Sequence, residues 1–453
     1  MALCTAKRSI FGGLIISSMD NFHYKNGRLL CEDIEVDAII EEHGTPCYIY
    51  SKETLTQHYN RFVQAFSELN PKAAFSMKSC NNISLLNVLI KLGAHIDIVS
   101  GGELYKAIKA GIDPKKVVFA GVGKSDAELE MAVENGIKYI NVESAQELEI
   151  LSKVAENKSK TASVVIRVNP DVFDDKTHVK TTTGNKTSKF GISYADVKGL
   201  FEAYIENPNV NIVGLHVHLG SPIYSPKPYV QAVAKIKELI NSIHEKFPSC
   251  IRSLNIGGGF PADYRGGDHL SWEEYAEKIV PTLRELIQQG IEIVMEPGRT
   301  ISANSGVFAC DVLYRKTAGD RQYLILNGGM SHFIRPAMYD SEHFIAPTLL
   351  KNNITSPAND QCLKNLELTD FSIAGPICES SDVLAESKPL PADTGRGNRL
   401  VFFSAGAYGM VMASNYNAVP RAPEIMVDGS NSHLIRERET FDDLCNKEIL
   451  IDL

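Results

Sequence analysis

Short runs of β-branched and other apolar residues recur at a constant spacing in the first half of the chain. Four of these runs begin 22 residues apart, at Ala73, His95, Val117 and Tyr139. Segments with the apolar periodicity of a helix lie between them, for example 102–111 and 124–136. Strands that alternate with helices at this spacing predict βαβ units and a parallel sheet.

Four further strand-like runs continue the alternation. They cover residues 164–170, 212–218, 253–259 and 292–298. Helical stretches lie around 194–206, 228–246 and 272–289. Eight strand–helix alternations are what a (β/α)₈ barrel requires, so the sequence predicts a TIM-like barrel over residues 51–299.

The pattern changes after Ser305, where strand-like runs follow one another with turn residues between them and little helical periodicity. These runs cover 307–315, 321–327, 371–378, 399–405 and 423–429. They predict a β-rich domain, a β-barrel or β-sandwich, formed by residues 300–453. The strand-like segment 23–33 is expected to join it, which assigns residues 19–50 to the same domain.

Three segments are expected to lie outside these elements. Residues 1–18 are predicted to be a disordered N-terminal extension. The polar segments 171–190 and 386–398 are predicted to be long loops, which in compact domains are often functional.

Composition excludes two classes of partner. No apolar run approaches the ~20 residues that a membrane span needs. The net charge of −9 disfavours nucleic acid, because neutralising phosphates requires a basic face. The nine cysteines are odd in number, scattered and without a C-x-x-C pair, which fits reduced thiols in the cytoplasm.

Polar side chains and glycines gather where the predicted barrel strands end. Catalysis in α/β barrels takes place at these carboxyl ends. The residues found there are Lys78, Asp97, Glu143, Arg167, His218, Ser221, Gly257, Gly258, Gly259, Glu296 and Arg299. This set contains too many polar residues for all of them to serve only as caps of the helices that follow.

Lys78 ends the first barrel strand in the stretch AAFSMKSCNN, where an ammonium is costly to desolvate unless the site uses it. Desolvation would lower its pKa and make the neutral amine a nucleophile. The run NIGGGFP offers backbone N–H groups that a phosphate could approach, although a glycine triplet alone is often only a turn.

A metal site is the alternative that LHVHLGS suggests, because His216 and His218 project to the same side of one strand. Zinc would need further histidines and a carboxylate at the neighbouring strand ends. Those ends carry Lys78, glycines and Arg167 instead, so we expect no metal. A lysine, a phosphate cradle, a flat histidine ring and a carboxylate together point to pyridoxal phosphate.

Several blocks of the chain resemble one family in order and content. They include FSMKSCNN, DIVSGGEL, FAGVGKSDAELE, GLHVHLGS, NIGGGFP, MEPGRT, GGMSHFIRPAMY, GPICESSD, SAGAYGMVMASNYN and RAPEIMVDG. The chain is similar over about residues 46–429 to the fold-type III ornithine/diaminopimelate/arginine pyridoxal phosphate decarboxylases, most closely to the members that act on diaminopimelate. The resemblance implies a barrel plus a β domain formed from both chain ends.

The resemblance also assigns cofactor roles. It makes Lys78 the residue that carries pyridoxal phosphate, His218 the residue stacked on the cofactor ring, and Glu296 the partner of the pyridine nitrogen. The phosphate binders would be Ser221, Gly257, Gly258, Gly259 and Tyr408. Racemases of the same barrel class place an arginine where this chain has Glu296, so the glutamate favours decarboxylation.

The implied reaction is decarboxylation of meso-2,6-diaminopimelate to L-lysine and CO₂, the last step of lysine biosynthesis. The substrate-binding residues would be Arg299, Arg335, Tyr339, Glu379 and Tyr408, the first three holding the distal carboxylate. Cys378 would supply the proton that replaces CO₂.

Two departures from the family pattern leave the substrate open. Ser79 and Cys80 follow the lysine, and Ser381 stands where glycine is usual. The alternatives are a decarboxylase of the same family acting on D-ornithine, D-lysine, arginine or carrier-bound glutamate, and a catalytically inactive regulatory relative. The resemblance further implies a homodimer in which the Cys378–Glu379 loop of one chain completes the other chain's site.

Overall fold

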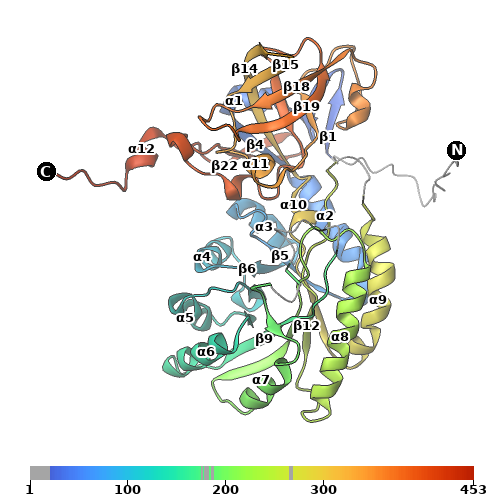
Figure 1. Ribbon diagram of the computed structural model, residues 1–453, viewed down its shortest axis with the longest axis vertical. Coiled ribbons are helices and arrows are strands. Elements are labelled where there is room, and N and C mark those ends of the chain that lie inside the picture. The colour runs from blue at the N-terminus through green and yellow to red at the C-terminus, as the bar shows by residue number, and fades with distance from the viewer. Residues whose placement is uncertain (1–20, 175–176, 178–182, 185–187, 265–268, 453) are drawn as a thin grey trace.

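The molecule has two lobes stacked along its long axis (Figure 1). One lobe is made of alternating strands and helices, and the other is made mainly of strands. The structure is a computed structural model that describes residues 21–174, 177, 183–184, 188–264 and 269–452. The predicted fold class, a (β/α)₈ barrel with a β-rich domain that takes up the N-terminal segment, is confirmed. The expected extension over residues 1–18 lies outside the described residues.

Eight parallel strands form the closed barrel, because β9 pairs with both β8 and β11 and so joins the two ends of the strand order. The strands are β5 (Lys72–Ser76), β6 (His95–Ile98), β7 (Val117–Phe119), β8 (Tyr139–Val142), β9 (Ala162–Asn169), β11 (Val210–His216), β12 (Ser253–Asn255) and β13 (Glu292–Met295). The short β10 (Ile192–Ser193) pairs with β9 outside the ring. All eight predicted runs are therefore strands. Their nearly continuous apolar sequence reflects burial on both faces, which is typical of parallel sheets.

Helices cover the outside of the barrel (Figure 1). They are α3 (Ile83–Lys91), α4 (Gly101–Lys109), α5 (Asp126–Asn135), α6 (Ala145–Asn157), α7 (Val197–Tyr204), α8 (Lys227–His244) and α9 (Trp272–Gln288). The last barrel strand is followed only by the short α10 (Arg299–Ser302). The place of an eighth outer helix is taken by α2 (Lys52–Ala65). This helix precedes the first barrel strand and packs against both α9 and α3.

Serine residues fix where several of these helices begin. The Ser125 hydroxyl accepts a hydrogen bond from the backbone N–H of Glu128, and the Glu128 side chain accepts one from the N–H of Ser125. Ser271 and Glu274 form the same capping box at the start of α9. Such boxes satisfy backbone donors that the first helical turn leaves unpaired.

The β-rich lobe is built on a sheet with the strand order β19-β18-β15-β14-β4-β21-β22. These strands are β4 (Cys47–Ser51), β14 (Gly306–Ala318), β15 (Arg321–Leu326), β18 (Leu368–Ala374), β19 (Val383–Pro391), β21 (Glu424–Asp428) and β22 (Asn431–Arg436). β20 (Arg399–Phe402) pairs with β14 and with β16 (Ile345–Pro347). Helix α11 (Arg335–Tyr339) lies between β15 and β16 in the chain.

Both ends of the chain contribute to this lobe. β1 (Phe22–Lys25), β2 (Arg28–Cys31) and β3 (Ile34–Glu35) form a small sheet with β17 (Ser356–Pro357), and α1 (Val36–His43) follows them. β4 lies between β14 and β21, so a strand from before the barrel is enclosed by strands from after it.

One sequence expectation is wrong. The segment 386–398 was expected to be a loop, but residues 386–391 belong to β19, which pairs with β18 through Asp370 and Pro389. Only Leu384 and Leu390 of β19 are fully buried. An edge strand with two prolines and exposed polar residues therefore looks like a loop in the sequence.

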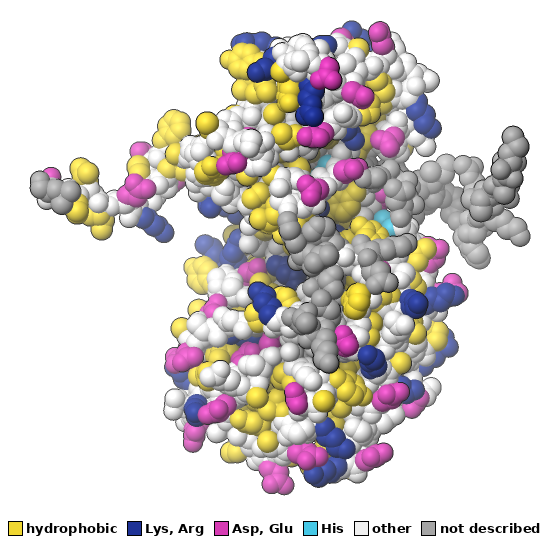
Figure 2. Space-filling model, in the orientation of Figure 1, with side chains coloured by type: hydrophobic (Ala, Val, Ile, Leu, Met, Phe, Trp, Pro, Cys, Tyr) yellow, Lys and Arg dark blue, Asp and Glu magenta, His cyan; other side chains and the backbone are white. Residues whose placement is uncertain are grey.

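The C-terminal residues leave the body of the molecule as an arm. The arm contains α12 (Phe441–Cys445) and continues to residue 452 (Figure 1). Phe441, Ile449, Leu450 and Ile451 are exposed, Leu450 by 95%, and Figure 2 shows apolar side chains along the arm. Among the described helices none has both the length and the apolar character that crossing a bilayer requires.

Candidate active site

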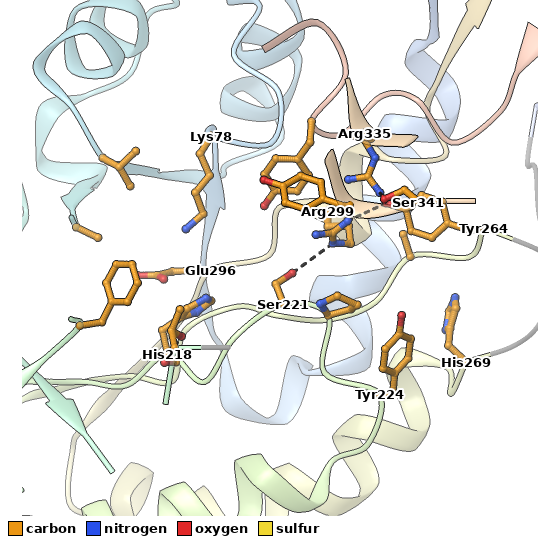
Figure 3. Close-up of a pocket in the computed structure, with 18 of the residues that line it drawn as sticks. Lys78, His218, Ser221, Tyr224, Tyr264, His269, Glu296, Arg299, Arg335 and Ser341 are labelled. Atoms are coloured by element: carbon orange, nitrogen blue, oxygen red, sulfur yellow. Dashed lines mark hydrogen bonds between the residues drawn. The ribbon is translucent and has the colours of Figure 1, made fainter. Parts of the chain in front are cut away.

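A cavity of about 780 Å³ is lined by residues at the carboxyl ends of the barrel strands and by residues of the β-rich lobe. Both lobes line it, the barrel with Lys78, Arg167, His218, Ser221, Glu296 and Arg299, and the β-rich lobe with Arg335, Tyr339 and Tyr408. In Figure 3, Lys78, His218 and Glu296 lie on one side of the view, and Arg335, Ser341 and Tyr264 on the other. The cavity thus brings together nine residues from six separate segments of the chain.

Lys78 directly follows β5 and extends into the cavity, with 35% of its side chain exposed. Its Nζ is 3.9 Å from Asp97 Oδ2. Burial lowers the pKa of Lys78, but the charges of Asp97, Tyr408 and Glu296 raise it by more, so the net pKa is above its ordinary value. The expectation of a lowered pKa is therefore wrong, because neighbouring carboxylates outweigh desolvation.

Asp97 and Glu296 are two buried carboxyl groups whose pKa values are shifted in opposite directions. Burial, and then the charge of Glu296, raise the pKa of Asp97 well above its usual range. Ser76 Oγ donates to Asp97 Oδ2 at 2.6 Å, while Asp97 Oδ1 has no hydrogen-bond partner among the described residues. Of the two carboxyl groups, Asp97 is the one that takes up a proton first.

Glu296 remains an anion. It follows β13, and Asn255 Nδ2 donates to its Oε1 at 2.7 Å. His216 Nε2 is 3.5 Å from its Oε2, close enough for charge attraction although too poorly aligned for a hydrogen bond. Burial raises the pKa of Glu296, but His216 and then His218 and Lys78 lower it by more, so the net pKa lies well below its ordinary value.

His218 presents a neutral ring to the cavity. The backbone N–H of Gly258 donates to its Nδ1 at 3.1 Å, which places the ring proton on Nε2. Burial is the main cause of a pKa well below the usual histidine value. A flat, uncharged imidazole at this position is suited to contact an aromatic cofactor ring.

The glycine triplet allows close packing of the strand ends. A Cβ on Gly258 would lie 2.0 Å from Glu296 O, and one on Gly259 would lie 2.3 Å from Gly220 O. The N–H of Gly257 is donated to Asn255 Oδ1 at 2.9 Å, and that of Gly258 to His218. The N–H of Gly259 has no acceptor among the described residues, so it is the N–H of the triplet that could donate a hydrogen bond to a phosphate.

Arg299 and Arg335 converge on one hydroxyl group. Arg299 Nη1 donates to Tyr264 Oη at 3.0 Å, and Arg335 Nη2 donates to the same atom at 3.3 Å. Neither guanidinium pairs with a carboxylate of the described residues. Arg299 Nε donates instead to Ser221 Oγ at 3.3 Å, and Arg335 Nε to His343 Nε2 at 3.4 Å.

Tyr408 and Tyr339 also line this part of the cavity. The Arg299 guanidinium carbon lies 4.8 Å from the centre of the Tyr408 ring, within the range of a cation–π contact. The Tyr408 N–H donates to Ser79 O at 2.7 Å, and its backbone is left-handed, with φ 58°. This hydrogen bond fixes Tyr408 next to the segment that carries Lys78.

Arg167 and Glu143 support the wall of the cavity. Arg167 Nη1 donates to Glu143 Oε1 at 2.7 Å, and both side chains are buried. The Arg167 guanidinium lies 4.6 Å from the centre of the Phe190 ring. Because its charge is paired, Arg167 is not free to act as a second cation toward a ligand.

Cys378 and Glu379 lie outside the cavity of their own chain. Both are exposed on the β-rich lobe. The Cys378 N–H donates to Asn417 Oδ1 at 2.9 Å, and Tyr416 Oη donates to Glu379 Oε2 at 3.1 Å. The catalytic role predicted for Cys378 and the substrate contact predicted for Glu379 stay predictions.

Three residues of the site were not found from the sequence. Asn255 could have been noticed, because it precedes the glycine triplet at the end of a barrel strand. Tyr264 and His343 carry no such signal, since they stand in loops. The contacts of Tyr264 with Arg335 and with the His343 ring form only when the two lobes meet. Contacts of this kind depend on the tertiary fold.

The residues of the cavity fit pyridoxal phosphate. They provide an amine at a strand end, an anion in Glu296 and a neutral ring in His218. Buried polar atoms of Asp97 and His216 also lack a hydrogen-bond partner among the described residues. This combination of an amine, a carboxylate and a flat ring is what the cofactor requires.

Comparisons with known proteins agree with this chemistry. The family of the pyridoxal-dependent decarboxylases, pyridoxal binding domain, matches residues 52–303. The diaminopimelate decarboxylase of Haemophilus influenzae is 37% identical over 426 residues, covering 94% of this chain and 98% of that protein. The diaminopimelate decarboxylase of Aquifex aeolicus is 38% identical over 420 residues, with 92% and 95% covered. The crystal structure of diaminopimelate decarboxylase from M. jannaschii with L-lysine has a TM-score of 0.87 at 32% identity, with 96% of this chain and 99% of that chain covered.

Proposed function

The chain belongs to the family of pyridoxal-dependent decarboxylases, and from this premise we propose that it converts meso-2,6-diaminopimelate into L-lysine and CO₂. In this reaction one carboxylate leaves as CO₂ and a proton takes its place on the same carbon. The second carboxylate, on the distal carbon, stays in the product.

The observation that carries this proposal is the pair Arg299 and Arg335. Their guanidinium groups meet at one hydroxyl, and neither is neutralised by a carboxylate among the described residues. Two cations at one end of a cavity attract a carboxylate and repel an ammonium, so they favour a substrate that is acidic at its distal end.

The side chains around Lys78 would hold the cofactor and tune it. Pyridoxal phosphate, when bound, supplies an electron-withdrawing ring that stabilises the charge left when CO₂ departs. Lys78 would attach it covalently, and Glu296 would keep a proton on its ring nitrogen because this carboxylate stays ionised. His218 would contact the ring. Ser221, Tyr408 and the triplet Gly257–Gly259, the last through the N–H of Gly259, would bind the phosphate.

We further propose that the protein is a homodimer with shared active sites. Cys378 and Glu379 are exposed and do not line the cavity of their own chain, so they are available to a second chain. The exposed apolar side chains of the C-terminal arm support burial against another chain. In this arrangement Cys378 donates the proton that replaces CO₂, and Glu379 accepts a hydrogen bond from the distal ammonium. A cytoplasmic location stays a prediction.

A substrate panel tests the reaction. Purified protein with pyridoxal phosphate is incubated separately with meso-diaminopimelate, D-ornithine, D-lysine and L-arginine, and CO₂ and amine products are measured. We expect CO₂ and L-lysine from diaminopimelate only. Turnover of a substrate with a single carboxylate, with none of diaminopimelate, would overturn the proposal.

A further inference from the structure

The hydroxyl of Tyr264 is placed between two guanidinium groups. It accepts one hydrogen bond from Arg299 at 3.0 Å and one from Arg335 at 3.3 Å. A tyrosine hydroxyl has two acceptor lone pairs and a single donor. The two arginines therefore use both lone pairs and leave the O–H as the group that can still form a hydrogen bond.

That O–H has no acceptor among the described residues. The two arginines also keep unused donors. Arg299 donates through Nε and Nη1, and Arg335 donates through Nε and Nη2, the latter also reaching Ser341 Oγ at 3.4 Å. Nη2 of Arg299 and Nη1 of Arg335 have no hydrogen-bond partner in the described part of the chain. These three sets of unpaired donors belong to residues that meet at Tyr264 Oη and line the cavity.

The surrounding rings hold this arrangement in place. The Tyr264 ring meets the His343 ring edge to face, with centroids 5.3 Å apart and an interplanar angle of 89°. The Arg335 guanidinium lies 5.3 Å from the centre of the Tyr264 ring and 6.0 Å from that of Tyr408. His343 Nδ1 donates to Phe403 O at 2.8 Å, so its Nε2 is free to accept from Arg335.

We propose that Tyr264 is a specificity-determining residue that donates its O–H to the distal carboxylate of the substrate while its lone pairs hold Arg299 and Arg335 around the same carboxylate. This inference rests on the proposed function, which supplies a substrate with a distal carboxylate. A carboxylate accepts hydrogen bonds only, so it satisfies all three sets of donors. A distal methylene or ammonium leaves them unpaired, which costs binding energy in a buried site.

The electrostatics of Tyr264 support this role. Burial raises the pKa of its hydroxyl, but Arg335 and then Arg299 lower it by more, so the net pKa lies below the ordinary tyrosine value. A more acidic O–H is a stronger hydrogen-bond donor, and a bond to a carboxylate is charge-assisted.

The test compares two ligands that differ in one group. L-lysine keeps the distal carboxylate, whereas cadaverine is the same chain without it. Competitive inhibition by each is measured for the wild type and for Tyr264→Phe, which retains the ring and its packing. We expect the variant to lose about ten- to a hundredfold in affinity for L-lysine and to bind cadaverine as the wild type does. Its KM for diaminopimelate should rise with little change in kcat.

Two results would overturn the inference: unchanged affinity for L-lysine, or an equal loss for both ligands, which would indicate a general disturbance of the cavity. Tyr105→Phe, an exposed tyrosine on α4, is the matched control and should match the wild type. If the wild type does not turn over diaminopimelate, the proposed function fails. If it does and the variant behaves as wild type, only the role of Tyr264 fails.

Discussion

At the scale of single residues, the site separates two carboxyl groups that lie close together. Both Asp97 and Glu296 are buried near Lys78, yet the pKa of Asp97 is raised and that of Glu296 is lowered. The difference arises from their partners, because His216 and Asn255 stabilise the charge of Glu296. Of these two carboxyl groups, Asp97 is therefore the first to be protonated as the pH falls, and Glu296 is the one that keeps its negative charge longer.

Replacing the charge of Glu296 should affect the chemical step. Glu296→Gln keeps the shape and should keep the cofactor bound, while kcat falls by about a hundredfold or more, because the carboxylate acts on charge that develops in the transition state. Steady-state kinetics and the absorbance of bound cofactor measure the two effects. Glu292→Gln, at the opposite end of the same strand, makes the same chemical change at a half-exposed ion pair and should keep normal activity. A normal kcat in Glu296→Gln would exclude this carboxylate from the mechanism.

The raised pKa of Lys78 gives a pH-dependent prediction. Burial lowers this pKa and Asp97 raises it, so Asp97→Asn removes the raising charge and should lower the net pKa. More of the neutral amine is then present at neutral pH, so the apoprotein should capture pyridoxal phosphate several times faster, with the pH midpoint of the capture rate displaced downward. Stopped-flow absorbance measures the rate, with the exposed Asp196→Asn as control. An upward displacement would contradict this account.

The sequence predicted some residues of the site better than others. Lys78, His218 and Glu296 end barrel strands, and strand ends can be counted from the hydrophobic pattern. The sign of the pKa shift of Lys78 could not be predicted, since it depends on the 3.9 Å approach of Asp97. Tyr264 could not be found because its partners Arg299 and Arg335 lie 35 and 71 residues further along the chain. The sequence around His343 gives no sign of its contact with Arg335, which lies eight residues before it.

At the scale of elements, helix α2 completes the outer layer of the barrel. Its Phe62 is fully buried, with ring centroids 5.2 Å from Phe260 and 6.1 Å from Trp272. Phe260 directly follows the glycine triplet, and Trp272 is the first residue of α9. This aromatic cluster therefore joins α2, which precedes the barrel, to α9 and to the glycine triplet of the active site.

Removing that ring should destabilise the barrel. We expect Phe62→Ala to reduce the free energy of unfolding by about 3–5 kcal/mol, through lost apolar burial and a cavity. Denaturant unfolding followed by tryptophan fluorescence is suitable, because the single Trp272 lies in the cluster. Asn60→Ala on the exposed face of the same helix should change stability by less than about 0.5 kcal/mol. Equal stability of the two variants would mean that α2 is not part of the cooperative unit.

Strands could be predicted where burial on both faces of the sheet requires a nearly continuous run of apolar residues. All eight barrel strands could be located for this reason. Short or exposed strands such as β16, β17, β19 and β22 could not, because their sequences carry little alternation. The pairing of β4 with β14 and β21 is also a property of the tertiary fold.

At the scale of the whole molecule, the shared-site dimer predicts complementation between two inactive variants. Lys78→Ala damages the barrel half of a site, and Cys378→Ala damages the half supplied by the neighbour. In a mixed dimer one site has both defects and the other has none. Random exchange makes about half of the dimers mixed, so activity should recover to about a quarter of the wild-type value.

Subunit exchange must be shown independently in that experiment, for example by native mass spectrometry of isotope-labelled chains. A mixture of Lys78→Ala with Glu296→Gln is the matched control, because both changes lie on the barrel half and no site escapes damage. If exchange occurs and the first mixture stays inactive, the Cys378 loop serves its own barrel.

The enclosure of β4 between strands from the other end of the chain has a consequence during synthesis on the ribosome. Residues 47–51 emerge early, and all five are buried in the finished protein. β14 follows only after the whole barrel, and β21 later still. At translation rates of roughly 5–20 residues per second, this apolar segment waits on the order of tens of seconds for its neighbours. The last barrel strand, β13, emerges only shortly before β14, so for most of this time β4 is a strand with two open edges and would benefit from protection by a chaperone.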